Sequence, residues 1–207
     1  MITIGLTGNI SCGKSTVSRY LADIGATIID ADLVSRDIVQ PGTPALRDII
    51  DYFGPDVLDS NGYLDRKQLG TLVFTNPKAM AVLNSITHPR IIEAIEHKKR
   101  EHAAKFKNSN SVLVIDAPLL IETGLHKSVD EIWVVTIDPH QQIKRLMQRD
   151  GISEIEAQKK VAAQMPQQEK AKYAHRTIDN NGTPTETITQ VKQHVKSILG
   201  LEQESSS

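Results

Sequence analysis

A pattern that could bind phosphate lies close to the first residue of the chain. Residues 8–15 read Gly-Asn-Ile-Ser-Cys-Gly-Lys-Ser and fit G-x-x-x-x-G-K-[ST]. In this pattern the glycines let the backbone approach an anion, the lysine ammonium reaches the outer phosphates, and the last hydroxyl ligates Mg²⁺. We expect Lys14 to be catalytic and Ser15 to ligate the metal. The whole loop is expected to bind the nucleotide through Gly8, Asn9, Ser11, Cys12, Gly13, Lys14, Ser15 and Thr16.

The residues around this pattern favour the same interpretation. Residues 2–6 form a short apolar run, typical of a buried parallel strand that delivers the loop at its carboxyl end. After the loop, Val17, Leu21 and Ile24 form the apolar stripe of a helix, and Gly25 is typical of a helix C-terminus. The alternative is an ordinary glycine-containing turn before a helix, but strand, loop and helix together favour a nucleotide site.

Carboxylates end two further apolar segments. Residues 26–32 predict a second strand that ends in Asp30 and Asp32, which would face the same side because they are two positions apart. The alternative is that Asp30 caps a turn and Asp32 starts the next helix. Residues 111–116 predict a third strand that ends in Asp116. We expect Asp32 to be the general base toward an attacking hydroxyl and Asp116 to hold Mg²⁺.

Two more strands complete an α/β fold with a doubly wound, parallel, five-stranded sheet. They are residues 131–137 and 176–179, and a helical pattern follows each of them. A stretch of seventy residues that separates the second and third strands is far longer than an ordinary connection. It contains four predicted helices, which begin at Pro44, Asp65, Asn76 and Pro89.

We expect one domain, residues 1–200, with three parts and a tail. The sheet core comprises residues 1–39, 111–144 and 173–200. The helical insertion, which is expected to bind substrate, comprises residues 40–110, and the helical lid comprises residues 145–172. Residues 201–207 are expected to form a disordered tail.

Three basic side chains outside the loop are candidates for the same chemistry. Arg145 and Arg149 lie one helical turn apart and could fold over a transferring phosphoryl group, although a solvent-facing pair is the alternative. His88 precedes a proline, and contact with substrate and capping of a helix are equally compatible with that position.

Composition limits the partners and the location of the protein. The formal charge of −1 and the pI near 6.7 give no general attraction for nucleic acid or acidic membranes. A single cysteine excludes an intramolecular disulfide, and no apolar run is long enough to cross a bilayer. We expect a cytoplasmic protein, a monomer or a weak homo-oligomer, that binds small molecules.

The chain resembles the dephospho-CoA kinase family over nearly its whole length. Beyond the phosphate loop, the resemblance rests on short motifs whose order and spacing are specific together: Asp30-Ala31-Asp32, Gly62-Tyr63-Leu64-Asp65-Arg66 with Leu69 and Phe74, His88-Pro89, Asp116-Ala117-Pro118-Leu119-Leu120 with Glu122, Arg145 to Gly151, Gln164, and Asp179-Asn180 with Gly182.

This resemblance implies a P-loop kinase that uses ATP and Mg²⁺ to phosphorylate the ribose 3′-hydroxyl of dephospho-CoA, the last step of coenzyme A synthesis. It implies that Asp32 lies near that hydroxyl, that Arg145 and Arg149 belong to the lid, and that Asn180 and Gly182 border the adenine. The residues expected to contact dephospho-CoA are Asp30, Asp32, His88, Leu119 and Glu122.

Three residues depart from the family pattern. Asn9 stands where a second glycine is usual, Cys12 where a small residue such as serine is common, and His175 where an aspartate often precedes the last strand. Because Cys12 lies near a helix N-terminus and beside Lys14, its thiol pKa is expected to fall, so that alkylation would block ATP binding. The alternative is that Cys12 is a small buried residue.

Other functions fit parts of the sequence. Another small-molecule or nucleoside-monophosphate kinase would differ only in its acceptor. A GTPase is disfavoured because no N-K-x-D motif follows to recognise guanine, although residues 59–62 and 179–182 fit D-x-x-G. A nucleotide sensor without catalysis would not need Asp32.

Overall fold

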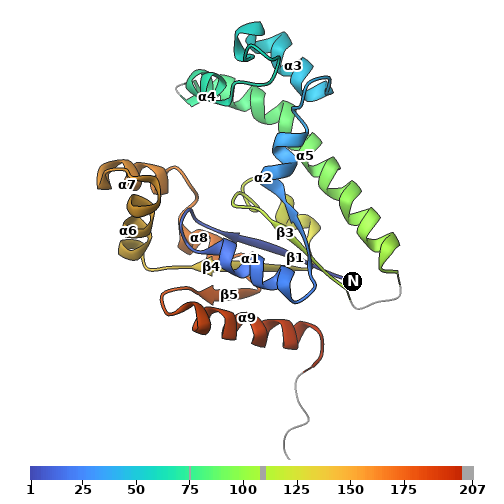
Figure 1. The fold of residues 1–207 in the computed structure, drawn as a ribbon, viewed down its shortest axis with the longest axis vertical. Coiled ribbons are helices and arrows are strands. Elements are labelled where there is room, and N and C mark those ends of the chain that lie inside the picture. Colours follow the sequence, from blue (N-terminus) through green and yellow to red (C-terminus); the bar gives the residue numbers. More distant parts are fainter. Residues whose placement is uncertain (75, 108–110, 202–207) are drawn as a thin grey trace, which may run out of the picture. The chain divides into compact units, whose positions relative to one another are not determined.

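The computed structural model describes residues 1–74, 76–107 and 111–201, so most of the predicted tail lies outside it. The chain divides into two compact units, shown in Figure 1. Unit 1 contains residues 1–28 and 105–207, and unit 2 contains residues 29–104.

The described residues form a five-stranded sheet with the order β2-β3-β1-β4-β5 (Figure 1). The central strand β1 pairs in parallel with β3 and β4, and β4 pairs in parallel with β5. The predicted parallel, doubly wound α/β fold is confirmed. The strands are β1 (Ile2–Gly8), β2 (Thr27–Asp30), β3 (Val112–Asp116), β4 (Glu131–Thr136) and β5 (Arg176–Asp179).

Apolar side chains of the strands and of two helices make the core of unit 1. Helices α1 (Lys14–Asp23) and α9 (Pro184–Ile198) contribute Val17, Leu21 and Val191 to it. Strands β3 and β4 contain consecutive buried apolar residues, as expected of parallel strands that are covered on both faces. The buried members from the strands and their ends include Ile4, Leu6, Val114, Trp133, Val135, Ile137 and Ile178.

Side-chain caps begin three of the helices that follow β4 and β5. Asp138 accepts hydrogen bonds from the backbone amides of His140 and Gln141. Capping boxes at Ser153 and Thr183 begin the helices that start at Glu154 and Pro184. Each supplies partners for amides that a helix start leaves unpaired. The other helical segments of unit 1 are η2 (Leu125–Ser128), α6 (Pro139–Asp150), α7 (Glu154–Ala162) and α8 (Gln167–Ala171).

Unit 2 is helical and has its own apolar core. It contains α2 (Ala31–Asp37), α3 (Pro44–Phe53), η1 (Pro55–Val57), α4 (Arg66–Phe74) and most of α5 (Pro77–Lys105). The core includes Val39, Ala45, Ile49, Val57, Leu69, Val73 and Ala79. Among the described residues of both units, no helix is both long enough and apolar enough to span a membrane.

The prediction that a fourth helix begins at Pro89 is wrong. Pro89 lies inside α5, which runs without a break for 29 residues. A proline inside a helix costs about 3 kcal/mol because it removes one hydrogen bond and crowds the preceding turn. Packing opposes this cost, since Ile86 on one side of Pro89 contacts the core of unit 2 and Ile95 on the other is fully buried.

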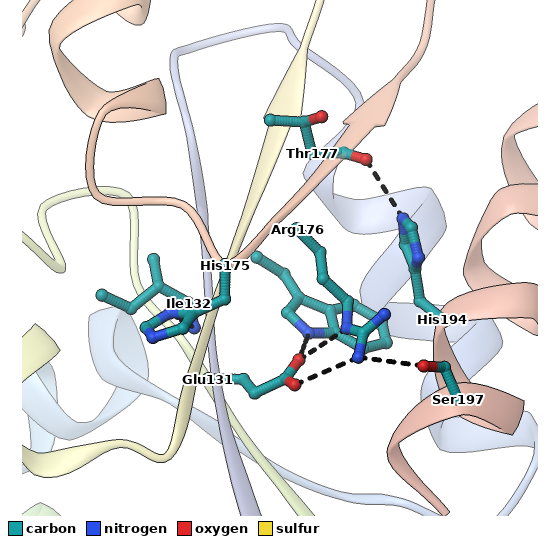
Figure 2. Close-up of polar contacts among 8 residues, drawn as sticks. Glu131, Ile132, His175, Arg176, Thr177, His194 and Ser197 are labelled. Carbon is teal, nitrogen blue, oxygen red and sulfur yellow. Dashed lines mark hydrogen bonds and ion pairs between the residues drawn. The ribbon is translucent and has the colours of Figure 1, made fainter. Parts of the chain in front are cut away.

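A polar cluster joins β4, β5 and α9 in unit 1 (Figure 2). The Glu131 carboxylate accepts hydrogen bonds from the Trp133 indole at 2.7 Å and from Arg176 Nε at 2.8 Å. The Arg176 guanidinium also donates to Ser197 Oγ at 3.2 Å. His175, the departure from the family pattern, accepts a hydrogen bond from the Ile132 amide through Nδ1 at 3.0 Å. A ring nitrogen thus fills an acceptor position that a carboxylate could also fill.

Glu131 is expected to stabilise the folded protein at neutral pH, and acid is expected to remove this contribution. Partial burial opposes its ionisation, but the hydrogen bonds from Arg176 and Trp133 outweigh burial and lower its pKa. A group whose pKa is lower in the folded state stabilises the fold at pH values above its unfolded-state pKa. This contribution is lost as the pH falls through the folded-state pKa. We expect Glu131→Gln to reduce the free energy of unfolding at pH 7 by on the order of 1 kcal/mol.

Urea unfolding of the wild type and Glu131→Gln at pH 7 and pH 3 checks this prediction. The difference between the two proteins should shrink at pH 3. An equal difference at both pH values would show that the Glu131 charge does not contribute.

Candidate active site

The loop between β1 and α1 has the backbone that the sequence pattern requires. Gly13 precedes the helix with φ 93°, and Ser11 adopts φ 58°, a left-handed conformation that is uncommon for a residue other than glycine. At Gly8, an added Cβ would lie 2.8 Å from the carbonyl oxygen of Val135. Gly8 and Gly13 therefore depend on the absence of a side chain, and Ser11 requires a locally strained backbone.

The first turn of α1 presents an uncompensated positive end. Gly13 has no side chain to cap the helix, and the first turn contains no acidic residue. Free amides and the helix dipole at such a terminus attract anions. The side chains of Lys14, Ser15 and Thr16 begin the helix at the same place, so the structure brings these predicted phosphate-binding residues together.

The structure pairs Lys14 with Asp116. The Lys14 ammonium and the Asp116 carboxylate form a hydrogen-bonded ion pair, and their side chains are only 18% and 10% exposed. Asp116 ends β3 opposite Leu6 of β1, so two neighbouring parallel strands deliver the loop and the acid to the same edge of the sheet. The sequence predicted a role for each residue but not the pair.

Asn180 supports the loop from the end of β5. Its side-chain nitrogen donates to the Cys12 carbonyl at 2.7 Å, and its side-chain oxygen accepts from the Thr187 hydroxyl at 2.7 Å. Its backbone carbonyl accepts from Arg145 at 3.1 Å. At Gly182, an added Cβ would collide with the Glu186 carboxylate that closes the capping box of α9.

The two candidate arginines differ in their surroundings. Arg145 contacts the Asn180 carbonyl and so lies beside a residue that supports the loop. Arg149 is more exposed, and its Nε donates to Asp150 at 2.8 Å. Hydrogen bonds from Arg149 and then from Lys160 lower the pKa of Asp150 to about 2. At neutral pH, ion pairs therefore join Asp150 at the end of α6 to Arg149 and to Lys160 of α7.

Lys170 is a buried cation that the sequence analysis missed. Its side chain is 0% exposed, and the ammonium donates to the Pro118 carbonyl at 2.5 Å and pairs with Glu122 at 3.0 Å. A single lysine in a short polar helix gives no signal in the sequence that distinguishes it from solvated lysines. Glu122, expected at the substrate, therefore also holds α8 against the segment after β3, whereas Leu119 is exposed.

The predicted fall in the thiol pKa of Cys12 is wrong. Cys12 is 1% exposed, and burial raises its pKa to about 11, although the backbone and charge of Lys14 act in the opposite direction. Burial wins because the thiolate would lose its solvation, whereas the Lys14 ammonium is already paired with Asp116. The alternative, a small buried residue, is what the structure shows.

Cys12 is expected to resist alkylation in the native protein. With a pKa of about 11, only about one thiol in a thousand is ionised at pH 8, and the thiolate is the reactive form. Mass spectrometry after iodoacetamide treatment should find full labelling in urea and little without it. Stoichiometric labelling of the folded protein within minutes would contradict this prediction.

In unit 2, the predicted strand across Asp30 and Asp32 is wrong. Strand β2 ends at Asp30, whose carboxylate accepts hydrogen bonds from the amides of Asp32 at 2.8 Å and Leu33 at 3.1 Å. Asp30 thus caps α2, and Asp32 lies in its first turn. Capping wins because the oxygen of a short side chain satisfies amides that the helix start leaves unpaired.

His88 lies inside α5 and therefore caps no helix end. Its ring is partly buried, and burial lowers its pKa. The ring is consequently uncharged at neutral pH. Of its two predicted alternatives, capping is wrong, and contact with substrate stays a prediction.

The chain is similar to known proteins over nearly its whole length. Residues 2–186 match the family model described as dephospho-CoA kinase. A dephospho-CoA kinase from Geobacter metallireducens is 50% identical over 191 residues, which cover 92% of this chain and 94% of the relative. Among solved structures, a protein from Thermus thermophilus has a TM-score of 0.78 at 27% identity, with 98% of both chains covered. The dephospho-CoA kinase from Campylobacter jejuni has a TM-score of 0.73 at 27% identity, with 97% of this chain and 98% of that chain covered.

Proposed function

Because this chain belongs to the dephospho-CoA kinase family, we propose that it transfers the γ-phosphoryl group of ATP to the ribose 3′-hydroxyl of dephospho-CoA, which gives coenzyme A and ADP. The observation that carries this proposal is the Lys14–Asp116 pair at the end of the glycine-bounded loop. A cation and a carboxylate at one edge of the sheet suit a phosphoryl group that travels with a divalent metal ion.

The loop and the start of α1 hold the phosphates. Lys14 exchanges Asp116 for phosphate oxygens and stabilises the charge that spreads over the transferring group. Ser11 supports this role, because its Oγ is buried and has no hydrogen-bond partner in the described part of the chain. A buried hydroxyl without a partner is costly unless a ligand satisfies it.

Ser15 and Asp116 would hold Mg²⁺ together with phosphate oxygens and water. Among the described residues, no group of three or more His, Cys, Asp or Glu side chains is arranged to hold a metal ion. Magnesium bound mainly through substrate phosphates needs only one or two protein ligands, so these two residues fit. When bound, the ion neutralises charge on the β- and γ-phosphates.

Five residues are proposed to act on the acceptor. Asp32, in the first turn of α2, takes the proton of the attacking hydroxyl. Asp30, His88, Leu119 and Glu122 contact dephospho-CoA. The uncharged ring of His88 suits a hydrogen bond with a neutral group, and exposed Leu119 offers an apolar contact.

The helical insertion and the helical lid have separate proposed roles. The insertion, residues 40–110, binds dephospho-CoA, and an apolar core that lies mostly within it supports this role. The lid, residues 145–172, excludes water and brings Arg145 and Arg149 to the transferring group. Asn180 and Gly182 border the adenine. The sheet core, residues 1–39, 111–144 and 173–200, holds these parts in one domain of residues 1–200.

The location, oligomeric state and partners of the protein are also part of the proposal. We infer that the protein works in the cytoplasm as a monomer or weak homo-oligomer and binds no nucleic acid. The formal charge of −1 supports this inference, because phosphate backbones attract proteins through excess positive charge. Light scattering during gel filtration measures the oligomeric state.

An acceptor panel tests the proposed function. The protein is incubated with ATP, Mg²⁺ and one of three acceptors: dephospho-CoA, its 3′-deoxy analogue, or phosphopantetheine. We expect chromatography to find ADP and coenzyme A with dephospho-CoA alone. Turnover with the 3′-deoxy analogue, or no turnover with dephospho-CoA, would contradict the proposal and favour another small-molecule kinase.

A further inference from the structure

Side-chain amides hold both backbone polar groups of one residue, Ile10, in the phosphate loop. The Ile10 amide donates to Gln164 Oε1 at 2.7 Å, and the Ile10 carbonyl accepts from Gln142 Nε2 at 2.8 Å. Next to this residue, Asn9 Nδ2 donates to the Met165 carbonyl at 3.0 Å. All of these residues belong to unit 1.

The partners come from two separate segments. Gln142 lies in α6 and is 4% exposed, whereas Gln164 and Met165 lie in the connection between α7 and α8. The backbone fixes which atom of each glutamine faces Ile10, because an N–H group can only donate and a carbonyl oxygen can only accept. Gln164 is therefore the acceptor and Gln142 the donor.

This arrangement constrains a loop that is locally strained. Ser11, the next residue, has φ 58°, and such a conformation persists only where the surroundings hold it. Loss of one partner would leave a polar group of Ile10 unsatisfied or free to turn, and the amides that face phosphate would move with it.

We propose that Gln142 and Gln164 are positioning residues that hold the phosphate loop in its ATP-binding conformation and couple it to the segment from α6 to α8. This inference rests on the proposed function for its catalytic consequences, but ATP binding tests it without turnover. Neither glutamine contacts substrate in this account. Both act through the backbone N–H and C=O groups of Ile10.

Methionine substitutions test the proposal because methionine keeps the length of the side chain and removes the strong hydrogen bond. We expect Gln142→Met and Gln164→Met to raise the Kd of ATP, measured by calorimetry, about tenfold. The Kd of dephospho-CoA and kcat at saturating ATP should change less than threefold. A merely structural role would lower the melting temperature without this selective change.

Gln167 provides a matched control. Its side chain alone bonds both backbone polar groups of Ile137: it accepts from the Ile137 amide at 2.9 Å and donates to the Ile137 carbonyl at 3.0 Å. Gln167→Met should lower the melting temperature and leave the Kd of ATP unchanged. Equal weakening of ATP binding in Gln167→Met, or unchanged binding in Gln164→Met, would overturn the proposal.

Glutamate substitutions add the same charge at both positions but keep only one of the two hydrogen bonds. Gln164→Glu retains an acceptor for the Ile10 amide, whereas Gln142→Glu places a carboxylate against the Ile10 carbonyl. We expect Gln164→Glu to bind ATP within about threefold of wild type and Gln142→Glu to bind it at least tenfold more weakly. The reverse order would overturn the proposal. If Gln142 variants do not fold, the half-buried Gln164 position decides through its methionine and glutamate variants.

These results separate failure of the inference from failure of the proposed function. A protein that binds ATP but does not phosphorylate dephospho-CoA still reports the effect of each glutamine on the phosphate loop. Normal kinase activity with unaltered ATP binding in the methionine variants would reject the positioning role alone.

Discussion

Lys14→Met is expected to reduce kcat/KM for coenzyme A formation by about a thousandfold. Lys14 is the cation at the start of α1, and removal of one preorganised charge that stabilises a transition state typically costs a factor of about 10² to 10³. The variant also leaves the Asp116 carboxylate, only 10% exposed, without its ion-pair partner. We therefore expect a lower melting temperature as well, unless Mg²⁺ binds nearby.

Quenched-flow measurement of coenzyme A formation checks the chemical step of Lys14→Met, and calorimetry checks ATP binding. Lys144→Met removes an exposed lysine of α6 and serves as the control, with activity within twofold of wild type. A Lys14→Met protein that is folded and retains more than a tenth of wild-type kcat would contradict the assigned role.

Asp32→Asn is expected to reduce the rate of phosphoryl transfer about a hundredfold or more, the usual scale of general-base catalysis. Asparagine keeps the size of the side chain and cannot take a proton at neutral pH. ATP affinity should remain within about threefold of wild type, because the proposed phosphate contacts belong to the loop and α1. Single-turnover kinetics with saturating ATP measures the loss.

Asp37→Asn is the control for Asp32→Asn. Asp37 is exposed in the last turn of the same helix and has no assigned role in the reaction. Its substitution should leave the rate within twofold. Retention of wild-type transfer in Asp32→Asn would favour a nucleotide-binding protein without this base, or a different base.

Local patterns predicted most of the secondary structure of the sheet unit. Apolar runs that end in a glycine loop or an acid gave the strands, because a buried parallel strand needs apolar residues on both faces. In unit 2, Thr43-Pro44 combines an N-cap side chain, whose oxygen accepts a hydrogen bond from a backbone amide, with a proline at the first helical position, where an N–H group would have no helical partner. Helix α3 begins there, as predicted.

Local patterns misled where tertiary packing or a competing local interaction decided the outcome. Pro89 is a helix-starting signal by itself, yet buried residues on both sides carry α5 through it. Asp30 could end a strand or cap a helix, and its two amide partners select the cap. Cys12 has an activating neighbour in sequence, but its burial depends on side chains distant along the chain.

The candidate site was predictable in its residue types and not in its pairings. The phosphate loop follows a spacing that its chemistry dictates, so Lys14 and Ser15 were identified from the sequence. The Lys14–Asp116 pair, the hydrogen bond from Lys170 to Pro118 and the two glutamines at Ile10 join positions separated by 52 to 154 residues. Such partners have no periodicity in the sequence and emerge only when the strands and helices are packed.

Transfer of a label from ATP to coenzyme A is the sharpest test of the proposed phosphoryl transfer. ATP labelled in its γ-phosphoryl group is supplied with Mg²⁺ and dephospho-CoA, and the product is separated and digested to locate the label. We predict that the label appears on the ribose 3′-oxygen of coenzyme A with wild-type protein and is reduced at least a hundredfold with Lys14→Met or Asp32→Asn. Label found only in inorganic phosphate, or at another position of the acceptor, would contradict the account.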